Sequence, residues 1–237
     1  MERMNKAKIA TLLLAFSLSS LSFASGEHED PQGVAPKQAY QELLSGNKRF
    51  LDGKVSHPKQ DEARRRVLAS GQQPHTIVLS CSDSRVPPEL VFDQGLGELF
   101  TVRVAGNVLG AATVASIEYA VEHLGSRLIV VMGHESCGAV KAALSAKKGQ
   151  TSGSPDLDTL VAAIQPNLDG VDRSLAAADK TIREPVKKNV NGVAAQLLRR
   201  SLIVRKAVES GKVSIVPAIY GLESGKVDFW DTASLEK

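Results

Sequence analysis

Two short apolar runs, each followed directly by a segment that contains a cysteine, constrain this chain more than any other feature. The runs cover 76–80 and 128–132, and the segments after them are Cys-Ser-Asp-Ser-Arg at 81–85 and Gly-His-Glu-Ser-Cys-Gly at 133–138. Both runs are uncharged and rich in β-branched residues, which is typical of strands buried in a parallel sheet. Because parallel strands end at the same edge of a sheet, we expect Cys81, His134 and Cys137 to lie close together.

These three side chains have the chemistry of a zinc site. Thiolate sulfur and imidazole nitrogen are ligands that Zn²⁺ prefers, and three protein ligands leave a fourth tetrahedral position for water or substrate. The spacing lets His134 close a strand and Cys137 open a helix, so that both reach one metal. A helix N-terminus also favours the thiolate form of Cys137. The sequence therefore predicts a zinc site with Cys81, His134 and Cys137 as ligands and one open position.

Asp83 and Arg85 follow Cys81 closely enough to belong to the same site. If Cys81 turns toward the metal, Asp83 is near enough either to compete for the fourth position or to accept a proton from the group that occupies it. Arg85 favours the charged carboxylate and can bind it through two hydrogen bonds. We expect this pair to keep the fourth position open. The alternative is a surface ion pair that contributes about 0–1 kcal/mol.

The two motifs resemble those of the beta-class carbonic anhydrases. The resemblance is carried by Cys81, Asp83 and Arg85 in C-S-D-S-R and by His134 and Cys137 in G-H-E-S-C-G-A-V, with supporting matches at Gln72 in Q-Q-P and at T-V-R-V-A-G-N, 101–107. It extends over 35–220, which is nearly all of the expected mature chain. One departure is Val104, which stands where the family usually has an asparagine.

The resemblance implies zinc-dependent, reversible hydration of CO₂ to bicarbonate and a proton. Asp83 would accept a hydrogen bond from the water at the metal, and Arg85 would hold Asp83 in place. Gln72 matches a position at which part of the family binds substrate across the dimer interface, and Gly138 offers a backbone N–H near the site. Their structural alternatives are a solvated loop residue and a tight turn. The family also implies a homodimer or a higher even oligomer, with N-terminal helices packing on the partner subunit.

Other interpretations of the same residues stay open. A related zinc hydrolase of carbonyl sulfide or carbon disulfide would use the same ligands. A non-catalytic zinc protein would close the site with Asp83 as a fourth ligand, and a cysteine hydrolase would use Cys137 with His134 as its base. In an oxidising compartment Cys81 and Cys137 could form a disulfide, but a structural disulfide needs none of the other motif residues beside it.

The N-terminus predicts export. Three basic residues precede the apolar stretch 9–21, and Ser22-Phe23-Ala24 supplies small residues at the positions that a signal peptidase reads. The stretch is shorter than the ~20 residues of a membrane span. We therefore expect residues 1–24 to be a cleaved signal peptide, with release into a bacterial periplasm and no stable membrane association after cleavage.

The charge balance gives no reason to expect nucleic acid as a partner. The chain carries 29 Lys and Arg against 26 Asp and Glu, a formal net charge of +3. Removal of residues 1–24 takes away Glu2, Arg3, Lys6 and Lys8, so the balance falls to about +1. A small-molecule substrate, CO₂ or bicarbonate, is the partner that the motifs indicate.

After a connector at 25–35, residues 36–237 predict one α/β domain, a mainly parallel sheet flanked by helices. Expected strands are 76–80, 99–104, 128–132, 213–220 and 227–230; expected helices are 36–52, 61–69, 113–124 and 138–147, followed by a break at 149–155 and a mostly helical stretch at 157–210. His28, His57, His75 and His123 lack a second partner at ligand spacing, so we interpret them as surface or loop residues. Glu135 receives no role.

Overall fold

The structure is a computed structural model that describes residues 33–147 and 151–236. The predicted signal peptide and most of the predicted connector lie outside these residues. Among the residues described, no helix combines the length and the apolar character that a membrane crossing needs.

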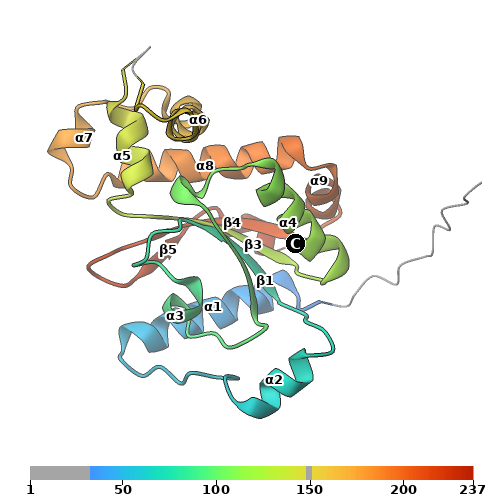
Figure 1. The fold of residues 1–237 in the computed structure, drawn as a ribbon. Coiled ribbons are helices and arrows are strands. Elements are labelled where there is room, and N and C mark those ends of the chain that lie inside the picture. The colour runs from blue at the N-terminus through green and yellow to red at the C-terminus, as the bar shows by residue number, and fades with distance from the viewer. Residues whose placement is uncertain (1–32, 148–150, 237) are drawn as a thin grey trace, which may run out of the picture.

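The molecule is built on a sheet of five strands in the order β2-β1-β3-β4-β5 (Figure 1). Strands β1 (Thr76–Ser80), β2 (Leu99–Arg103), β3 (Leu128–His134) and β4 (Ser214–Tyr220) are parallel, and β5 (Val227–Phe229) pairs antiparallel with β4. The prediction of a mainly parallel sheet is confirmed. Strand β3 runs two residues further than predicted, so that His134 is its last residue.

Helices cover both faces of this sheet (Figure 1). Their bounds are α1 Pro36–Leu51, α2 Glu62–Leu68, α3 Pro88–Val91, α4 Ala111–His123, α5 Gly138–Ser145, α6 Pro155–Ile164, α7 Leu175–Ala178, α8 Arg183–Arg200 and α9 Leu202–Glu209, with 3₁₀ turns η1 Ala105–Asn107, η2 Gln165–Leu168 and η3 Thr232–Glu236. The predicted helical stretch 157–210 is thus several elements. Pro166 lies in the first turn of η2 and Pro185 in the first turn of α8, whereas α7 and α9 begin without a proline. The short helix α3 has no counterpart in the sequence prediction.

Successive strand side chains alternate between two cores, as the pleat requires. Ile77 and Leu79 of β1 pack with α4, α5, α8 and α9 on one face. Val78, between them, packs with α1 and α3 on the other. Gly133 permits a close approach beside the end of β3, because a Cβ there would lie 2.5 Å from Val186 Cγ1 of α8. The strand ends that carry the motifs are therefore fixed from both faces.

The histidines predicted as surface or loop residues differ in their burial. His57 and His123 are exposed, but His75 is buried just before β1. Its Nδ1 lies 2.7 Å from Thr76 Oγ1 and its Nε2 lies 3.2 Å from Gln94 Oε1. Burial lowers the pKa of His75, partly offset by the contact with Gln94. His75 is therefore a loop residue, as interpreted, but a buried one, and its burial was not predicted because its partners come from the following strand and from a loop further along the chain.

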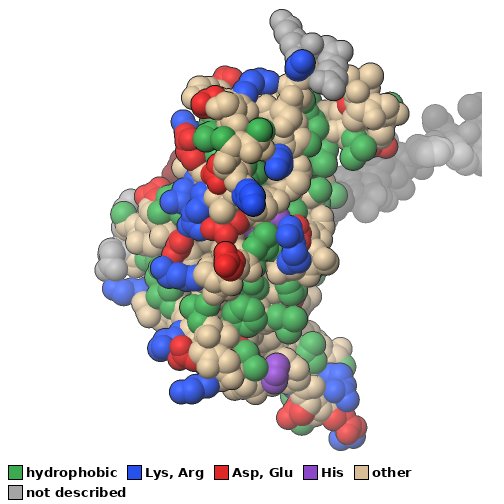
Figure 2. All heavy atoms as spheres, turned by 90° about the vertical axis from the view of Figure 1, so that its left-hand side faces the viewer, with side chains coloured by type: hydrophobic (Ala, Val, Ile, Leu, Met, Phe, Trp, Pro, Cys, Tyr) green, Lys and Arg blue, Asp and Glu red, His purple; other side chains and the backbone are tan. Residues whose placement is uncertain are grey.

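Figure 2 shows the face of the molecule that lies on the left in Figure 1. Acidic and basic side chains are interspersed there, with apolar side chains between them. Neither sign of charge prevails on this face, in keeping with the small net charge of the chain.

A buried carboxylate, Asp93, joins α1 to the segment after α3. It accepts hydrogen bonds from the backbone N–H groups of Ser56 and His57, both at 3.0 Å, and from the side chains of Ser56 and Arg49. Its side chain is only 1% exposed. Burial raises the pKa of Asp93, but these donors outweigh it and lower the pKa to about 2. The ionised form therefore stabilises the fold.

We expect Asp93→Asn to lower the free energy of unfolding at pH 7 by about 1–3 kcal/mol, because an amide cannot accept all of these hydrogen bonds. The folded-state pKa lies below the unfolded value of about 3.9, so the stabilisation is present above that pH and is lost as the pH falls toward 2. Urea unfolding of both proteins at pH 7 and pH 3 measures this. A difference between them that does not shrink at pH 3 would contradict the assignment.

Candidate metal centre

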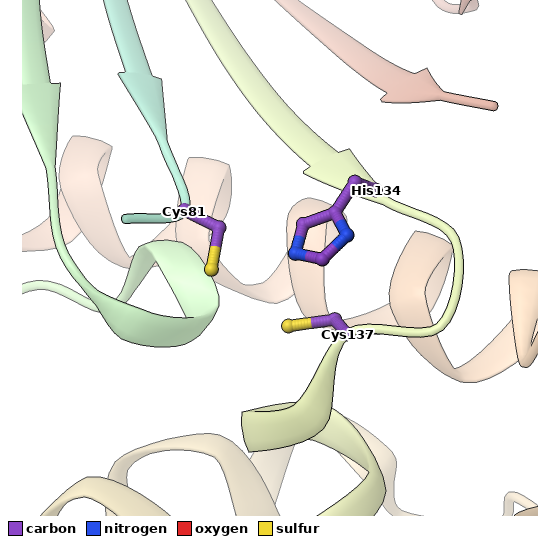
Figure 3. A group of neighbouring side chains, drawn as sticks. All are labelled: Cys81, His134 and Cys137. Atoms are coloured by element: carbon purple, nitrogen blue, oxygen red, sulfur yellow. The ribbon is translucent and has the colours of Figure 1, made fainter. Parts of the chain in front are cut away.

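Three buried side chains converge at the carboxyl ends of β1 and β3 (Figure 3). Cys81 follows β1, His134 ends β3, and Cys137 is the N-cap of α5. Because β1 and β3 are parallel neighbours in register, with Ser80 opposite Met132, these strand ends meet. The two sulfur atoms and a ring nitrogen of His134 all lie within 4.8 Å of one another. The structure thus brings together the three residues that the sequence predicted as ligands.

The orientation of His134 fits a metal ligand. Its Nδ1 lies 2.8 Å from the backbone oxygen of Glu135. Because a carbonyl can only accept, Nδ1 carries the proton and Nε2 offers its lone pair toward the two sulfur atoms (Figure 3). His134 is fully buried, and Nε2 has no hydrogen-bond partner among the residues that the structure describes. A buried orphan nitrogen beside two thiols is the donor set that Zn²⁺ prefers.

Both cysteines are free thiols in the structure. The hydrogen bond from Cys137 lowers the pKa of Cys81, and backbone N–H groups, including that of Gly106 at 3.4 Å from Cys81 Sγ, act in the same direction. The thiolate of Cys81 in turn raises the pKa of Cys137. Without a cation only one of the two sulfur atoms carries a negative charge, because two neighbouring thiolates repel each other. A divalent cation between them would offset this repulsion.

Asp83 and Arg85 form the predicted pair. Arg85 Nε donates to Asp83 Oδ1 at 2.9 Å and Arg85 Nη2 donates to Oδ2 at 2.7 Å. The Arg85 backbone N–H also donates to Oδ1, at 3.0 Å. Arg85 holds the pKa of Asp83 well below its usual range. Asp83 Oδ2 lies 3.7 Å from His134 Nε2, so an ionised carboxylate stands at the edge of the cluster.

Gln72 and Gly138 occupy different surroundings. Gln72 is exposed in the loop before β1, whereas Cys81 follows the other end of that strand. Five strand residues span about 16 Å, so Gln72 does not reach the cluster of its own chain. Gly138 is the first residue of α5, and a Cβ there would meet no atom of the described residues within 4 Å. Packing does not require a glycine at 138.

Val104, the departure from the family pattern, continues the pairing of β2 beyond Arg103. Its backbone N–H donates to Ser80 O at 3.1 Å, and its half-buried side chain packs against the larger core. Valine thus fills its position with an apolar contact and disturbs none of the three cluster residues.

Other residues, to which the sequence motifs assigned no role, support the cluster. Arg103 donates to the backbone oxygens of Cys81, at 3.2 Å, and Asp83, at 2.7 Å, and so fixes the loop that carries both. Asn189 of α8, fully buried, donates to Gly106 O at 2.9 Å. Gly106 adopts φ +63 and presents its N–H to Cys81 Sγ. In the sequence, Asn189 could have been noticed as a polar residue on the apolar face of α8.

Comparison with known proteins places these features in a family. A family model described as carbonic anhydrase matches residues 76–227. Carbonic anhydrase 2 of Mycobacterium tuberculosis is 39% identical over 196 residues, covering 81% of this chain and 91% of the relative. The carbonic anhydrase of Mycolicibacterium smegmatis is 42% identical over 194 residues, covering 81% of this chain and 92% of the relative.

Solved structures agree with this. Beta-carbonic anhydrases of Sordaria macrospora, described as tetrameric, include a chain with a TM-score of 0.63 and 25% identity, covering 82% of this chain and 98% of that one. The Coccomyxa beta-carbonic anhydrase, solved with acetazolamide, has a TM-score of 0.63 and 26% identity, covering 78% and 83%. The match over most of the sequence, together with the shared fold, shows that this chain belongs to the beta class of the carbonic anhydrase family.

Proposed function

We propose that this protein hydrates CO₂ reversibly to bicarbonate and a proton, with Zn²⁺ held by Cys81, His134 and Cys137. The observation that carries the proposal is the buried triad of ligand atoms within 4.8 Å of one another, in which His134 Nε2 has no hydrogen-bond partner in the described part of the chain. Membership of the family supports the reaction. The ion-paired Asp83 at the edge of the triad supports an open fourth position.

The chain's own residues orient the reactants. Zn²⁺ in this site would supply a water-derived nucleophile near neutral pH. Asp83 Oδ1 accepts two hydrogen bonds from Arg85, but Oδ2 accepts only one. Oδ2 therefore keeps a lone pair, and it is the oxygen nearest His134 Nε2. Asp83 can accept a hydrogen bond from the reacting water through Oδ2, which aims the water oxygen at the carbon of CO₂.

The overall reaction balances without a redox partner. One C–O bond forms between the water oxygen and carbon, one C=O bond opens, and one proton leaves. Arg85 keeps Asp83 ionised and fixed, so that Asp83 acts as a hydrogen-bond acceptor throughout and does not take the place of a fourth ligand. Gly138 N–H, at the start of α5, would donate to the substrate from an uncrowded position.

The rival chemistries are separable by one set of measurements. Stopped-flow CO₂ hydration on residues 25–237, with zinc determined on the same sample, should give fast hydration and about one zinc per chain. Hydrolysis of carbonyl sulfide and carbon disulfide is measured in parallel. A zinc-loaded protein that hydrolyses carbonyl sulfide or carbon disulfide fast but hydrates CO₂ slowly would show that CO₂ is not the main substrate. A zinc-loaded protein without any turnover across pH would indicate a closed site with Asp83 bound.

We also propose that the protein is at least a dimer. Among the described strands, β2 lies at one edge of the sheet, and every one of its residues is only half-buried in the single chain. An edge strand of this kind can pair with that of a second copy. Since Gln72 lies too far from its own cluster, a partner's cluster is the one that it would serve. Light scattering should give at least twice the mass of one chain; a monomer with full activity would contradict both statements.

Export remains a proposal that rests on the N-terminal sequence. Cleavage after Ala24 predicts a mature protein that begins at Ser25. N-terminal sequencing of protein recovered from a periplasmic fraction tests this, and an intact Met1 would contradict it.

A further inference from the structure

Glu135, between the two ligands His134 and Cys137, turns its side chain away from the metal centre. Its carboxylate accepts a hydrogen bond from Arg183 Nη1 and another, at 3.2 Å, from the backbone N–H of Leu222. The side chain is only 15% exposed. A charged group buried to this extent needs partners, and Arg183 supplies the opposite charge. Arg183 is the first residue of α8, 48 positions further along the chain.

Arg183 joins three parts of the fold. Its Nη2 donates to Asp228 Oδ2 of β5 at 2.7 Å, while Nη1 holds Glu135. Lys226 Nζ lies 2.7 Å from the other oxygen of Asp228. The ligand loop 134–137, the start of α8 and strand β5 are thereby fixed to one guanidinium group.

The backbone of Glu135 connects its ion pair with Arg183 to His134. Its N–H donates to Tyr220 O at 3.0 Å, and its carbonyl oxygen is the acceptor that holds His134 Nδ1–H. The direction of that carbonyl therefore sets the plane of the imidazole ring and the direction of Nε2. Groups that hold the second nitrogen of a ligating histidine determine its tautomer and its affinity for metal.

The backbone is strained in both segments that the Glu135–Arg183 pair joins, the ligand loop and the segment before α8. Ser136 adopts φ +57, with its N–H bonded to Thr181 O at 2.8 Å. Ile182, fully buried, adopts φ +45, a conformation that a β-branched residue rarely takes. Such backbone persists only where the surroundings enforce it. The Glu135–Arg183 pair connects the residue before Ser136 to the residue after Ile182, so it helps to hold both strained loops in place.

We infer that the Glu135–Arg183 ion pair is a positioning device for the metal ligand His134, and that it sets the rate at which the site releases its metal. The inference rests on the proposed zinc site. Neither residue belongs to the cluster of ligand atoms: Glu135 acts through its own carbonyl group, and Arg183 acts through Glu135.

The test compares Glu135→Gln with a matched control, Glu98→Gln. The Glu98 side chain is 16% exposed and pairs with Arg64 and Lys59, but it precedes β2 at the other end of the sheet from the cluster. For Glu135→Gln we expect zinc release to excess chelator about 10–100-fold faster than in wild type. We also expect the visible absorption bands of the Co²⁺-substituted protein to shift. Glu98→Gln should leave both unchanged, while the metal-free thermal midpoints of the two variants fall by similar amounts.

A second variant, Arg183→Met, and the double variant test whether the effect belongs to the ion pair or to one residue alone. Arg183→Met should release zinc as fast as Glu135→Gln, and the double variant should be no faster than either, because the two residues act as one unit. If both single variants release zinc at the wild-type rate, or if Glu98→Gln accelerates release equally, the inference is wrong while the proposed zinc site stands. A wild-type protein that binds neither Zn²⁺ nor Co²⁺ would overturn the metal assignment, and this inference with it.

Discussion

Cys137→Ala is expected to lose its zinc and to hydrate CO₂ at least about 10³-fold more slowly than wild type, because it lacks the metal that activates water. Cys137 is buried and contributes one of only three ligand atoms. Two remaining ligands leave zinc two further positions to fill, which lowers its affinity. Zinc content and stopped-flow hydration, measured on one preparation, test this.

Cys81→Ser serves as the companion variant, since Cys81 is the other thiol of the cluster. A zinc site predicts the same loss of metal and activity from both variants. A cysteine hydrolase with His134 as its base predicts that only the Cys137 variant is inactive. Circular dichroism of the metal-free proteins controls for folding, and full hydration by Cys137→Ala would contradict the metal centre.

The second large effect is expected at Asp83. Asp83→Asn should lower kcat/KM about 10²-fold while zinc stays bound, because the amide loses the charged acceptor without touching a ligand atom. Arg85 keeps the pKa of Asp83 far below neutral, so the carboxylate is ionised at every pH used in hydration assays. The loss should therefore be seen at both neutral and alkaline pH. A loss confined to one end of the pH range would contradict this role.

Arg85→Ala tests the same pair from the other side. In this variant the Asp83 carboxylate loses both hydrogen bonds from the guanidinium group and keeps the one from the backbone N–H of residue 85. It lies 3.7 Å from His134 Nε2, where it is free to become a fourth ligand. This variant should hydrate CO₂ more slowly yet release zinc to chelator more slowly as well. Full activity across pH would show that Arg85 does not hold the fourth position open.

The cluster was predictable because its geometry follows from local patterns. Two apolar runs fix two buried strands, and parallel pairing of these strands brings Cys81 beside His134. Cys137 follows within the same loop. Asp83 and Arg85 are two residues apart, so their pairing also needs no distant contact.

The supporting residues were not predictable in this way because their partners lie far along the chain. Asn189 meets Gly106 across 83 positions, and Arg183 meets Glu135 across 48. No periodicity or spacing encodes such pairs. The burial of His75 was missed for the same reason, since Gln94 reaches it from beyond α3.

Both ends of the described chain lie at the edge of the sheet opposite the metal centre. The backbone of Gly33 approaches Gly125, just before β3, so closely that a Cβ would fall 1.8 Å from the Gly125 oxygen. Ser234 O accepts a hydrogen bond from Ser214 Oγ, at the first residue of β4, at 3.0 Å. A solid support or a fused protein attached at either end would therefore be held at the end of the sheet away from the chain's own metal centre, so that immobilisation there leaves the ligand loop of that chain untouched.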